Sequence, residues 1–125
     1  MGQKKILIVE DDLILSMLNN KFVTSLGHEV VKSVKTGEAA VEFARENKFD
    51  LILMDVRLKG KMDGIEAMKE INRHKNIPAV YITGNSDPET KRRAEETNMI
   101  AFCVKPISYE ELESILGKIE NIMSY

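Results

Sequence analysis

The sequence has little of several features that protein classes depend on, and each absence narrows the possible functions. It holds a single cysteine, Cys103, which excludes an intramolecular disulfide and a multi-cysteine zinc site. Because Cys103 lies between Phe102 and Val104 in an apolar run, we interpret it as a small core residue. Basic residues are not in excess either, since 18 Lys and Arg face 20 Asp and Glu for a net charge of -2. That balance does not favour binding to nucleic acid or to an anionic membrane.

A long hydrophobic run is missing from the beginning of the chain. Only the apolar residues 6–9 stand between the opening Met-Gly-Gln-Lys-Lys and Glu10. This run is too short for a signal peptide or a membrane span, so we expect a cytoplasmic protein. The length of 125 residues favours one core, and we see no linker, internal repeat or low-complexity tract. We therefore predict one domain over residues 1–125.

Short apolar runs alternate with longer amphipathic segments five times along the chain. The runs cover residues 5–9, 29–34, 51–54, 79–82 and 100–104. They are shorter than ordinary helices, and several are rich in β-branched residues, so they predict buried strands. Five strand–helix units of this kind predict an α/β fold with a parallel sheet and helices on both faces.

The amphipathic segments carry helix signals. Asp63 with Glu66 forms a capping box for a third helix, and Ser108 begins a similar box for the last. The fourth segment has a thin apolar face with little beyond Ala94, which predicts loose packing. Gly27 can end the first helix in a left-handed conformation. The apolar positions predicted to face inward in the first and last helices are Leu15, Leu18, Phe22, Leu26, Leu112, Ile115, Leu116, Ile119 and Ile122.

Polar side chains stand directly after four of the predicted strands. These are Asp11 and Asp12, Asp55, Thr83, and Lys105. Since open α/β sheets bind ligands beyond the carboxyl ends of their strands, all five should share one crevice. Three carboxylates so close together repel each other unless they bind protons or a cation. Oxygen ligands that leave room for water suit Mg²⁺.

The same residues fit phosphoryl transfer. Thr83 and Lys105 opposite a metal would neutralise phosphoryl oxygens, and Asp55 would be the nucleophile that forms an acyl phosphate. Each residue alone has a simpler interpretation: Asp12 as a helix cap, Asp55 and Thr83 as turn residues, and Lys105 as a strand end. Their combination at the strand ends of one sheet favours the functional interpretation.

These motifs resemble the receiver domains of two-component response regulators over the whole chain. The matching segments are Ile-Leu-Ile-Val-Glu-Asp-Asp at 6–12, Asp-Leu-Ile-Leu-Met-Asp at 50–55, Asp-Gly-Ile-Glu at 63–66, Ile-Thr-Gly at 82–84 and Lys-Pro at 105–106. The resemblance implies a doubly wound, flavodoxin-like sheet in the order 2-1-3-4-5. It also implies a phosphoacceptor switch, to which a sensor histidine kinase or a histidine phosphotransfer protein gives its phosphoryl group at Asp55.

The resemblance further implies a role for each residue of the crevice. Thr83 and Lys105 would contact the phosphoryl group. The ligands of Mg²⁺ would be Asp11, Asp12, Asp55 and the backbone carbonyl of Arg57. Such a domain is a regulator that assists its own phosphorylation and dephosphorylation, and it is not an enzyme for an outside substrate.

The resemblance also implies a conformational output. The Lys105–Pro106 peptide bond would be cis, which proline makes accessible. Phe102 would be the switch aromatic that responds to Thr83, although spacing alone makes it an ordinary strand residue. The face of the fourth helix, fifth strand and fifth helix would then bind a downstream effector or a second copy, with no nucleic acid or membrane involved.

One segment departs from the commonest receiver pattern. The loop between Asp55 and Gly64 is one residue longer and lacks the proline usually found there. A minority of receivers share its Leu-x-Gly-x-x-Asp-Gly form, so the resemblance still holds. The conformation of this loop and the docking of a kinase beside it do not follow from the resemblance.

Three other functions compete with the phosphoacceptor switch. A magnesium-dependent phosphohydrolase of the haloacid-dehalogenase type also uses an aspartyl nucleophile, but it needs a carboxylate two residues later, where this chain has Arg57. A nucleotide or flavin module needs a glycine-rich loop after the first strand, where Glu10, Asp11 and Asp12 would repel phosphate. A receiver fold kept only for protein binding would not need the complete set of acidic, hydroxyl and lysine side chains.

Overall fold

A computed structural model describes residues 2–84 and 86–123, with side chains described as far as Ile119. The predicted inward position of Ile122 lies outside the described side chains. In chain order the elements are β1 (Lys5–Val9), α1 (Leu13–Ser25), β2 (Glu29–Val34), α2 (Gly37–Glu46), β3 (Leu51–Met54), α3 (Gly64–Asn72), β4 (Ala79–Thr83), α4 (Pro88–Glu95), β5 (Met99–Val104) and α5 (Tyr109–Met123).

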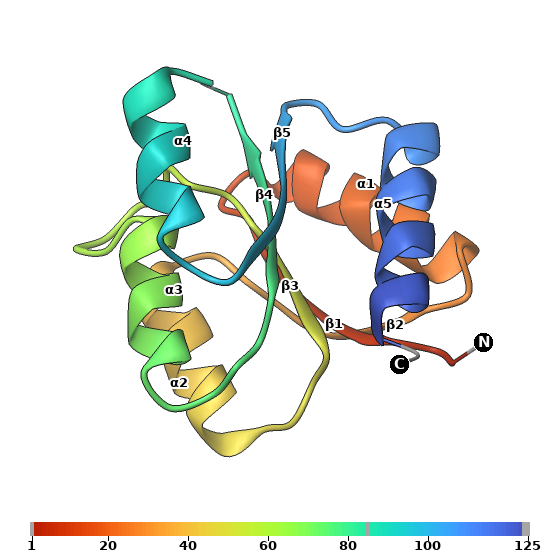
Figure 1. The fold of residues 1–125 in the computed structure, drawn as a ribbon, viewed down its shortest axis with the longest axis horizontal. Coiled ribbons are helices and arrows are strands. Elements are labelled where there is room, and N and C mark those ends of the chain that lie inside the picture. Colours follow the sequence, from red (N-terminus) through yellow and green to blue (C-terminus); the bar gives the residue numbers. More distant parts are fainter. Residues whose placement is uncertain (1, 85, 124–125) are drawn as a thin grey trace.

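The strands of the described chain form one parallel sheet in the order β2-β1-β3-β4-β5. This order confirms the predicted fold class and the doubly wound topology. Figure 1 shows α2, α3 and α4 on one side of the sheet and α1 and α5 on the other. Two of the predicted strands are extended by one residue, because β4 reaches Thr83 and β5 begins at Met99.

Two apolar clusters fill the space between the sheet and its helices. One lies under α2, α3 and α4 and includes Ile52, Met68 and Tyr81. The other lies under α1 and α5 and includes Ile8 and Leu112. Because β1, β3 and β4 are buried on both faces, their sequences are continuous apolar runs and do not alternate with polar residues. The central strands are thereby held on both sides.

Helix α1 is turned somewhat from the orientation that its apolar spacing predicts. Its buried residues are Asn19 and Val23, while Phe22 and Leu26 are partly buried against the core. The side chain of Leu18, which we predict to face inward, is 36% exposed. The apolar spacing misplaces it because α1 carries apolar residues on more than one side, so periodicity alone does not single out the buried face. As predicted, Gly27 follows α1 with a left-handed φ of 90°.

The helix ends follow the polar residues that the sequence offers. The Asp63 side chain accepts from the Glu66 amide, and the Glu66 side chain accepts from the Asp63 amide, which completes the predicted capping box. At the start of α5, the Ser108 hydroxyl accepts from the amide of residue 111 at 3.0 Å. Helix α4 buries Ala94 and no other of its residues, so the predicted thin apolar face is confirmed.

Two features of the structure match the expectations from composition: the environment of Cys103 and the character of the helices. The Cys103 thiol is free and buried, and burial raises its pKa to about 12, as expected for an inert core residue. Among the described residues, no helix combines the length and apolar character needed to cross a bilayer.

Candidate functional site

Backbone hydrogen bonds join the carboxyl ends of neighbouring strands in two pairs, β1 with β3 and β4 with β5. The amide of Asp55, after β3, donates to the Val9 carbonyl of β1 at 3.0 Å. The amide of Lys105, after β5, donates to the Thr83 carbonyl of β4 at 2.8 Å. The predicted crevice therefore has a rigid backbone, and the side chains that follow these strands are neighbours because of the sheet register.

The crevice holds a cluster of three carboxylates from two strand ends. Carboxylate oxygens of Glu10, Asp11 and Asp55 lie within 4.8 Å of one another. Glu10 is 2% exposed and Asp55 is 3% exposed, so water screens their repulsion poorly. Such a cluster is stable only if positive charge or protons offset it.

Lys105 supplies positive charge to this cluster. Its Nζ lies 2.7 Å from Oδ2 of Asp55 and 2.9 Å from Oε1 of Glu10. Burial raises the pKa of Glu10, although the Asp12 amide and Lys105 both act to lower it. Burial lowers the pKa of Lys105, but its hydrogen bonds to Asp55 and Glu10 outweigh this effect and the net shift is upward. Lys105 is therefore a charged partner shared by two buried carboxyl groups.

The first acidic segment is arranged differently from the sequence-based interpretation. We expect Asp12 to hold the metal with Asp11, but its carboxylate caps α1 by accepting from the Leu15 amide at 3.0 Å. Glu10 takes the third place in the cluster instead, and its Oε2 also accepts from the Asp12 amide at 3.0 Å. Glu10 is not among the metal ligands that the resemblance to receiver domains implies. The signal was that Glu10 directly follows β1, whereas Asp12 has the position of a helix cap.

The first residues of the loop after β3 contact the side chain of Asp55. The Arg57 amide donates to Oδ1 of Asp55 at 3.2 Å, so the peptide before Arg57 lies beside the carboxylate cluster. At the far end of the loop, the Gly64 amide donates to the Val56 carbonyl at 2.7 Å. A Cβ on Gly64 would overlap the Asp55 carbonyl oxygen, so only glycine permits this closure.

The residues predicted to act in the switch, Thr83 and Phe102, lie on the neighbouring strands β4 and β5. Thr83 is completely buried. Phe102 is partly buried, and its ring centroid lies 6.3 Å from that of Tyr81. The Lys105–Pro106 peptide bond is cis, which is the isomer that the resemblance implies. Of the predicted residues, Asp11, Asp55 and Lys105 meet in the crevice, whereas the Asp12 side chain does not join the carboxylate cluster.

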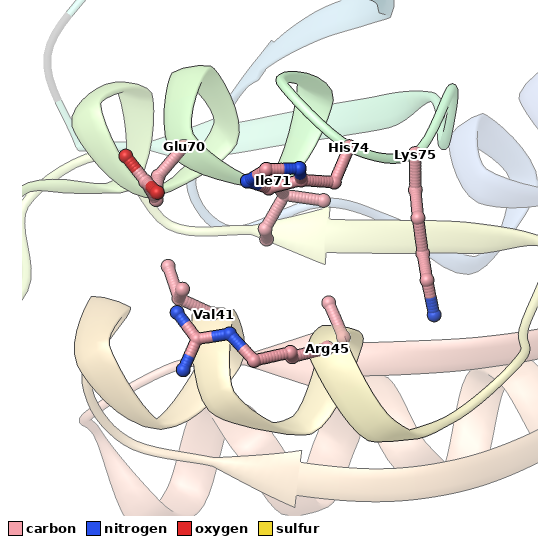
Figure 2. Close-up of a pocket in the computed structure, with 7 residues that line it drawn as sticks. Val41, Arg45, Glu70, Ile71, His74 and Lys75 are labelled. Carbon is pink, nitrogen blue, oxygen red and sulfur yellow. The ribbon is translucent and has the colours of Figure 1, made fainter.

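A second hollow lies between α2 and α3, away from the crevice. Figure 2 shows Val41 and Arg45 of α2 facing Ile71 of α3 and His74 just beyond it. Its volume of about 70 Å³ is well below the roughly 300 Å³ of the smallest ordinary ligand sites. It does not compete with the crevice as a ligand site.

Known proteins share both the motifs and the fold. The family model of the response regulator receiver domain matches residues 6–117. The transcriptional regulatory protein PdtaR of Mycobacterium tuberculosis is 34% identical over 109 residues, which are 87% of this chain and 53% of PdtaR. The signal receiver domain of a modulated diguanylate cyclase from Desulfovibrio desulfuricans G20 has a TM-score of 0.86 and 30% identity, covering 94% of this chain and 93% of that one.

A further solved structure combines this fold with a metal. It is the receiver domain of the sensor histidine kinase PA1611 from Pseudomonas aeruginosa PAO1, with a magnesium ion coordinated in its active site cleft. Its TM-score is 0.82 at 30% identity, covering 94% of this chain and 97% of that one. The chain belongs to the response regulator receiver domain family. It spans about half the length of PdtaR.

The shared role of Lys105 gives a stability prediction. Replacing Lys105 with Met leaves two buried carboxyl groups without their cation, so the free energy of unfolding should fall by about 3 kcal/mol at neutral pH. The pKa of Lys105 lies above its ordinary 10.5, so its contribution is complete below pH 10.5 and is lost as the pH rises past the folded value.

Urea denaturation without added metal measures this difference. The control is Lys118→Met, which changes the same charge on the exposed side of α5 and should cost less than about 0.5 kcal/mol. Equal losses in the two variants would contradict the proposed charge balance.

Proposed function

We propose that Asp55 accepts a phosphoryl group from the phosphohistidine of a sensor histidine kinase or a histidine phosphotransfer protein. One observation carries the proposal: the Asp55 carboxylate lies in the acidic crevice with the Lys105 ammonium 2.7 Å from Oδ2. A carboxylate used only for structure does not need two further acidic groups beside it. A nucleophile that must receive a charged group does need a cationic partner in place beforehand.

The transfer balances without a further reactant. An Asp55 oxygen forms a bond to phosphorus while the bond from phosphorus to the donor imidazole nitrogen breaks, and the imidazole keeps that electron pair. Lys105 would move from the free carboxylate to the transferred phosphoryl oxygens, and the Thr83 hydroxyl would add a second contact. Arg57 stands two residues after Asp55, where a phosphohydrolase would need an acid–base carboxylate, so the acyl phosphate serves as a signal in this proposal.

The carboxylates also fit a magnesium ion. Glu10, Asp11 and Asp55 offer only oxygen atoms within 4.8 Å of one another, which is the donor type that Mg²⁺ prefers. They would hold it together with the Arg57 carbonyl, and a related receiver holds magnesium in the cleft of its own active site. When bound, the ion supplies positive charge to the phosphoryl oxygens during transfer.

An apolar surface beside the crevice fits the donor protein. Leu13, Ile14 and Met17 on α1 are 61%, 76% and 64% exposed, and Val104 at the end of β5 is 47% exposed. Helix α1 follows the carboxyl end of β1 and Val104 ends β5, so both lie on the edge of the sheet that carries Asp55. Because the phosphoryl group must arrive attached to another protein, a helical donor that covers this surface would bring its histidine to the crevice.

The conformational output would pass through α4. Apolar burial holds this helix only at Ala94; two ion pairs to α3 supplement it, Arg93 with Asp63 and Lys69 with Glu96, both at 2.9 Å. If Thr83 shifts toward a phosphoryl group, Phe102 can fill the vacated space. Weakly packed elements are the ones that such a small change can displace. A downstream effector or a second copy would then read the face formed by α4, β5 and α5.

Phosphorylation of Asp55 is the first prediction of this proposal. After incubation with acetyl phosphate and Mg²⁺, intact-mass spectrometry should show one added phosphate, which hydroxylamine removes. Asp55→Asn should show none, because an amide does not form an acyl phosphate. Asp50→Asn changes the residue at the opposite end of β3 and should label normally. Labelling of Asp55→Asn at the wild-type level would refute the assignment.

The metal ligands can be distinguished by two matched variants. Asp11→Asn removes a carboxylate of the cluster and should weaken Mg²⁺ binding by about tenfold or more. Asp12→Asn should change binding by less than about threefold, because Asn keeps the helix cap and the side chain lies outside the cluster. Titration calorimetry with Mg²⁺ measures both. A larger loss in Asp12→Asn than in Asp11→Asn would return the ligand role to Asp12.

The switch predicts a change far from the crevice. Addition of beryllium fluoride, a mimic of the phosphoryl group, should shift NMR signals of Phe102 and of α4 as well as those beside Asp55. The Thr83→Ala variant should bind the mimic but lose the distant shifts, because it lacks the hydroxyl that links them. Shifts confined to the crevice in the wild-type protein would rule out this output.

A further inference from the structure

The loop from Arg57 to Asp63 is held in part by apolar packing, because Leu58 and Met62 lie partly buried against the core. It contains no proline and forms no helix or strand of its own. It is closed at its base by the hydrogen bond from the Gly64 amide to the Val56 carbonyl. A loop of this kind has high conformational entropy to lose when it becomes ordered. Yet its first residue, Arg57, must present its backbone to Asp55 in a defined way.

The tip of this loop is fastened to the beginning of α2. Lys59 forms an isolated parallel bridge with Thr36, the cap of that helix. The Lys61 amide donates to Oε2 of Glu38 at 2.9 Å. The pKa of Glu38 is lowered, first by this Lys61 amide and then by its own amide. The carboxylate is therefore held by backbone donors, one of which belongs to the loop.

Gly60 shows that the contact shapes the loop. It has a left-handed φ of 102°, and a Cβ at Gly60 would lie 3.0 Å from Oε1 of Glu38. The turn thus requires glycine both for its conformation and for the space that the carboxylate occupies. Close packing continues behind it, because a Cβ on Gly37 would lie 3.1 Å from Cβ of Met62.

We propose that Glu38 is a positioning residue of the phosphoacceptor site: by fastening the loop tip to α2, it holds the Arg57 backbone against Asp55 and on the metal side of the crevice. Glu38 touches neither Asp55 nor a phosphoryl group and acts only through the loop. The anchor does the work that a proline within the loop would otherwise do by restricting its backbone. This inference rests on the proposed function, because it assigns the Arg57 carbonyl to the metal.

Mg²⁺ binding and loop dynamics test this inference without any phosphotransfer. In Glu38→Ala, NMR titration of the Asp55 and Arg57 amides should show Mg²⁺ affinity lowered by about threefold to tenfold, as for other supporting contacts around a metal. Amide hydrogen exchange at residues 57–62 should become faster. Glu38→Gln keeps one acceptor oxygen and should restore part of both properties.

The matched control is Glu42→Ala, one turn further along the exposed side of α2, which should bind Mg²⁺ like the wild-type protein. Wild-type affinity in Glu38→Ala would overturn the inference, even if its loop exchanged faster. So would an equal loss of affinity in both variants, because that would indicate only the removal of a negative charge. If the wild-type protein itself bound no Mg²⁺, the metal part of the proposed function would fail, independently of Glu38.

Discussion

The functional site depends on one interaction, the ammonium of Lys105 shared between the carboxylates of Asp55 and Glu10. Without it, the carboxyl groups of Asp55 and Glu10, each at most 3% exposed, would face each other where charge is poorly screened. The sheet brings Lys105, Asp55 and Glu10 together. The backbone amide of Asp55 donates a hydrogen bond to the Val9 carbonyl, and the amide of Lys105 donates one to the Thr83 carbonyl. A phosphoryl group on Asp55 would give Lys105 a new and more highly charged partner, so the same interaction that stabilises the resting crevice would register phosphorylation.

The two sides of the crevice differ in how firmly they are held. Asp55, Thr83 and Lys105 lie at the ends of strands that are packed within the sheet, so their positions follow from register. Arg57 belongs to a loop that contacts α2 through Glu38 and packs Leu58 and Met62 against the core. The side of the crevice that we propose to contact a phosphoryl group is therefore set by the core of the domain. On the side of the Arg57 carbonyl, the surface contact between Glu38 and the Lys61 amide adds to this support, and we propose that an exposed side chain can tune it.

The sequence predicts most of the fold and which strand ends form the crevice, for physical reasons. The positions of the strands follow from the apolar runs, because a parallel strand covered by helices on both faces needs apolar side chains on both. The order of the strands came from the resemblance to receiver domains and not from these runs. Lys105 and Asp55 were predictable because they directly follow strands. The place of Glu10 in the carboxylate cluster was not, since it depends on which carboxylate turns to cap α1. The hydrogen bond between Glu38 and the Lys61 amide joins residues 23 positions apart through a backbone group. The pattern of side chains in the sequence therefore cannot predict it.

The central claim is that Asp55, Lys105 and Thr83 together hold a phosphoryl group beside a metal. A crystal structure of the protein with Mg²⁺ and beryllium fluoride tests this most directly. The account predicts beryllium bonded to an Asp55 oxygen, with fluorine atoms in contact with the Lys105 ammonium and the Thr83 hydroxyl, and Mg²⁺ bound by Asp11 and Asp55. Beryllium fluoride bound to a different carboxylate, or a Lys105 that stays on Glu10 with no contact to fluorine, would contradict it.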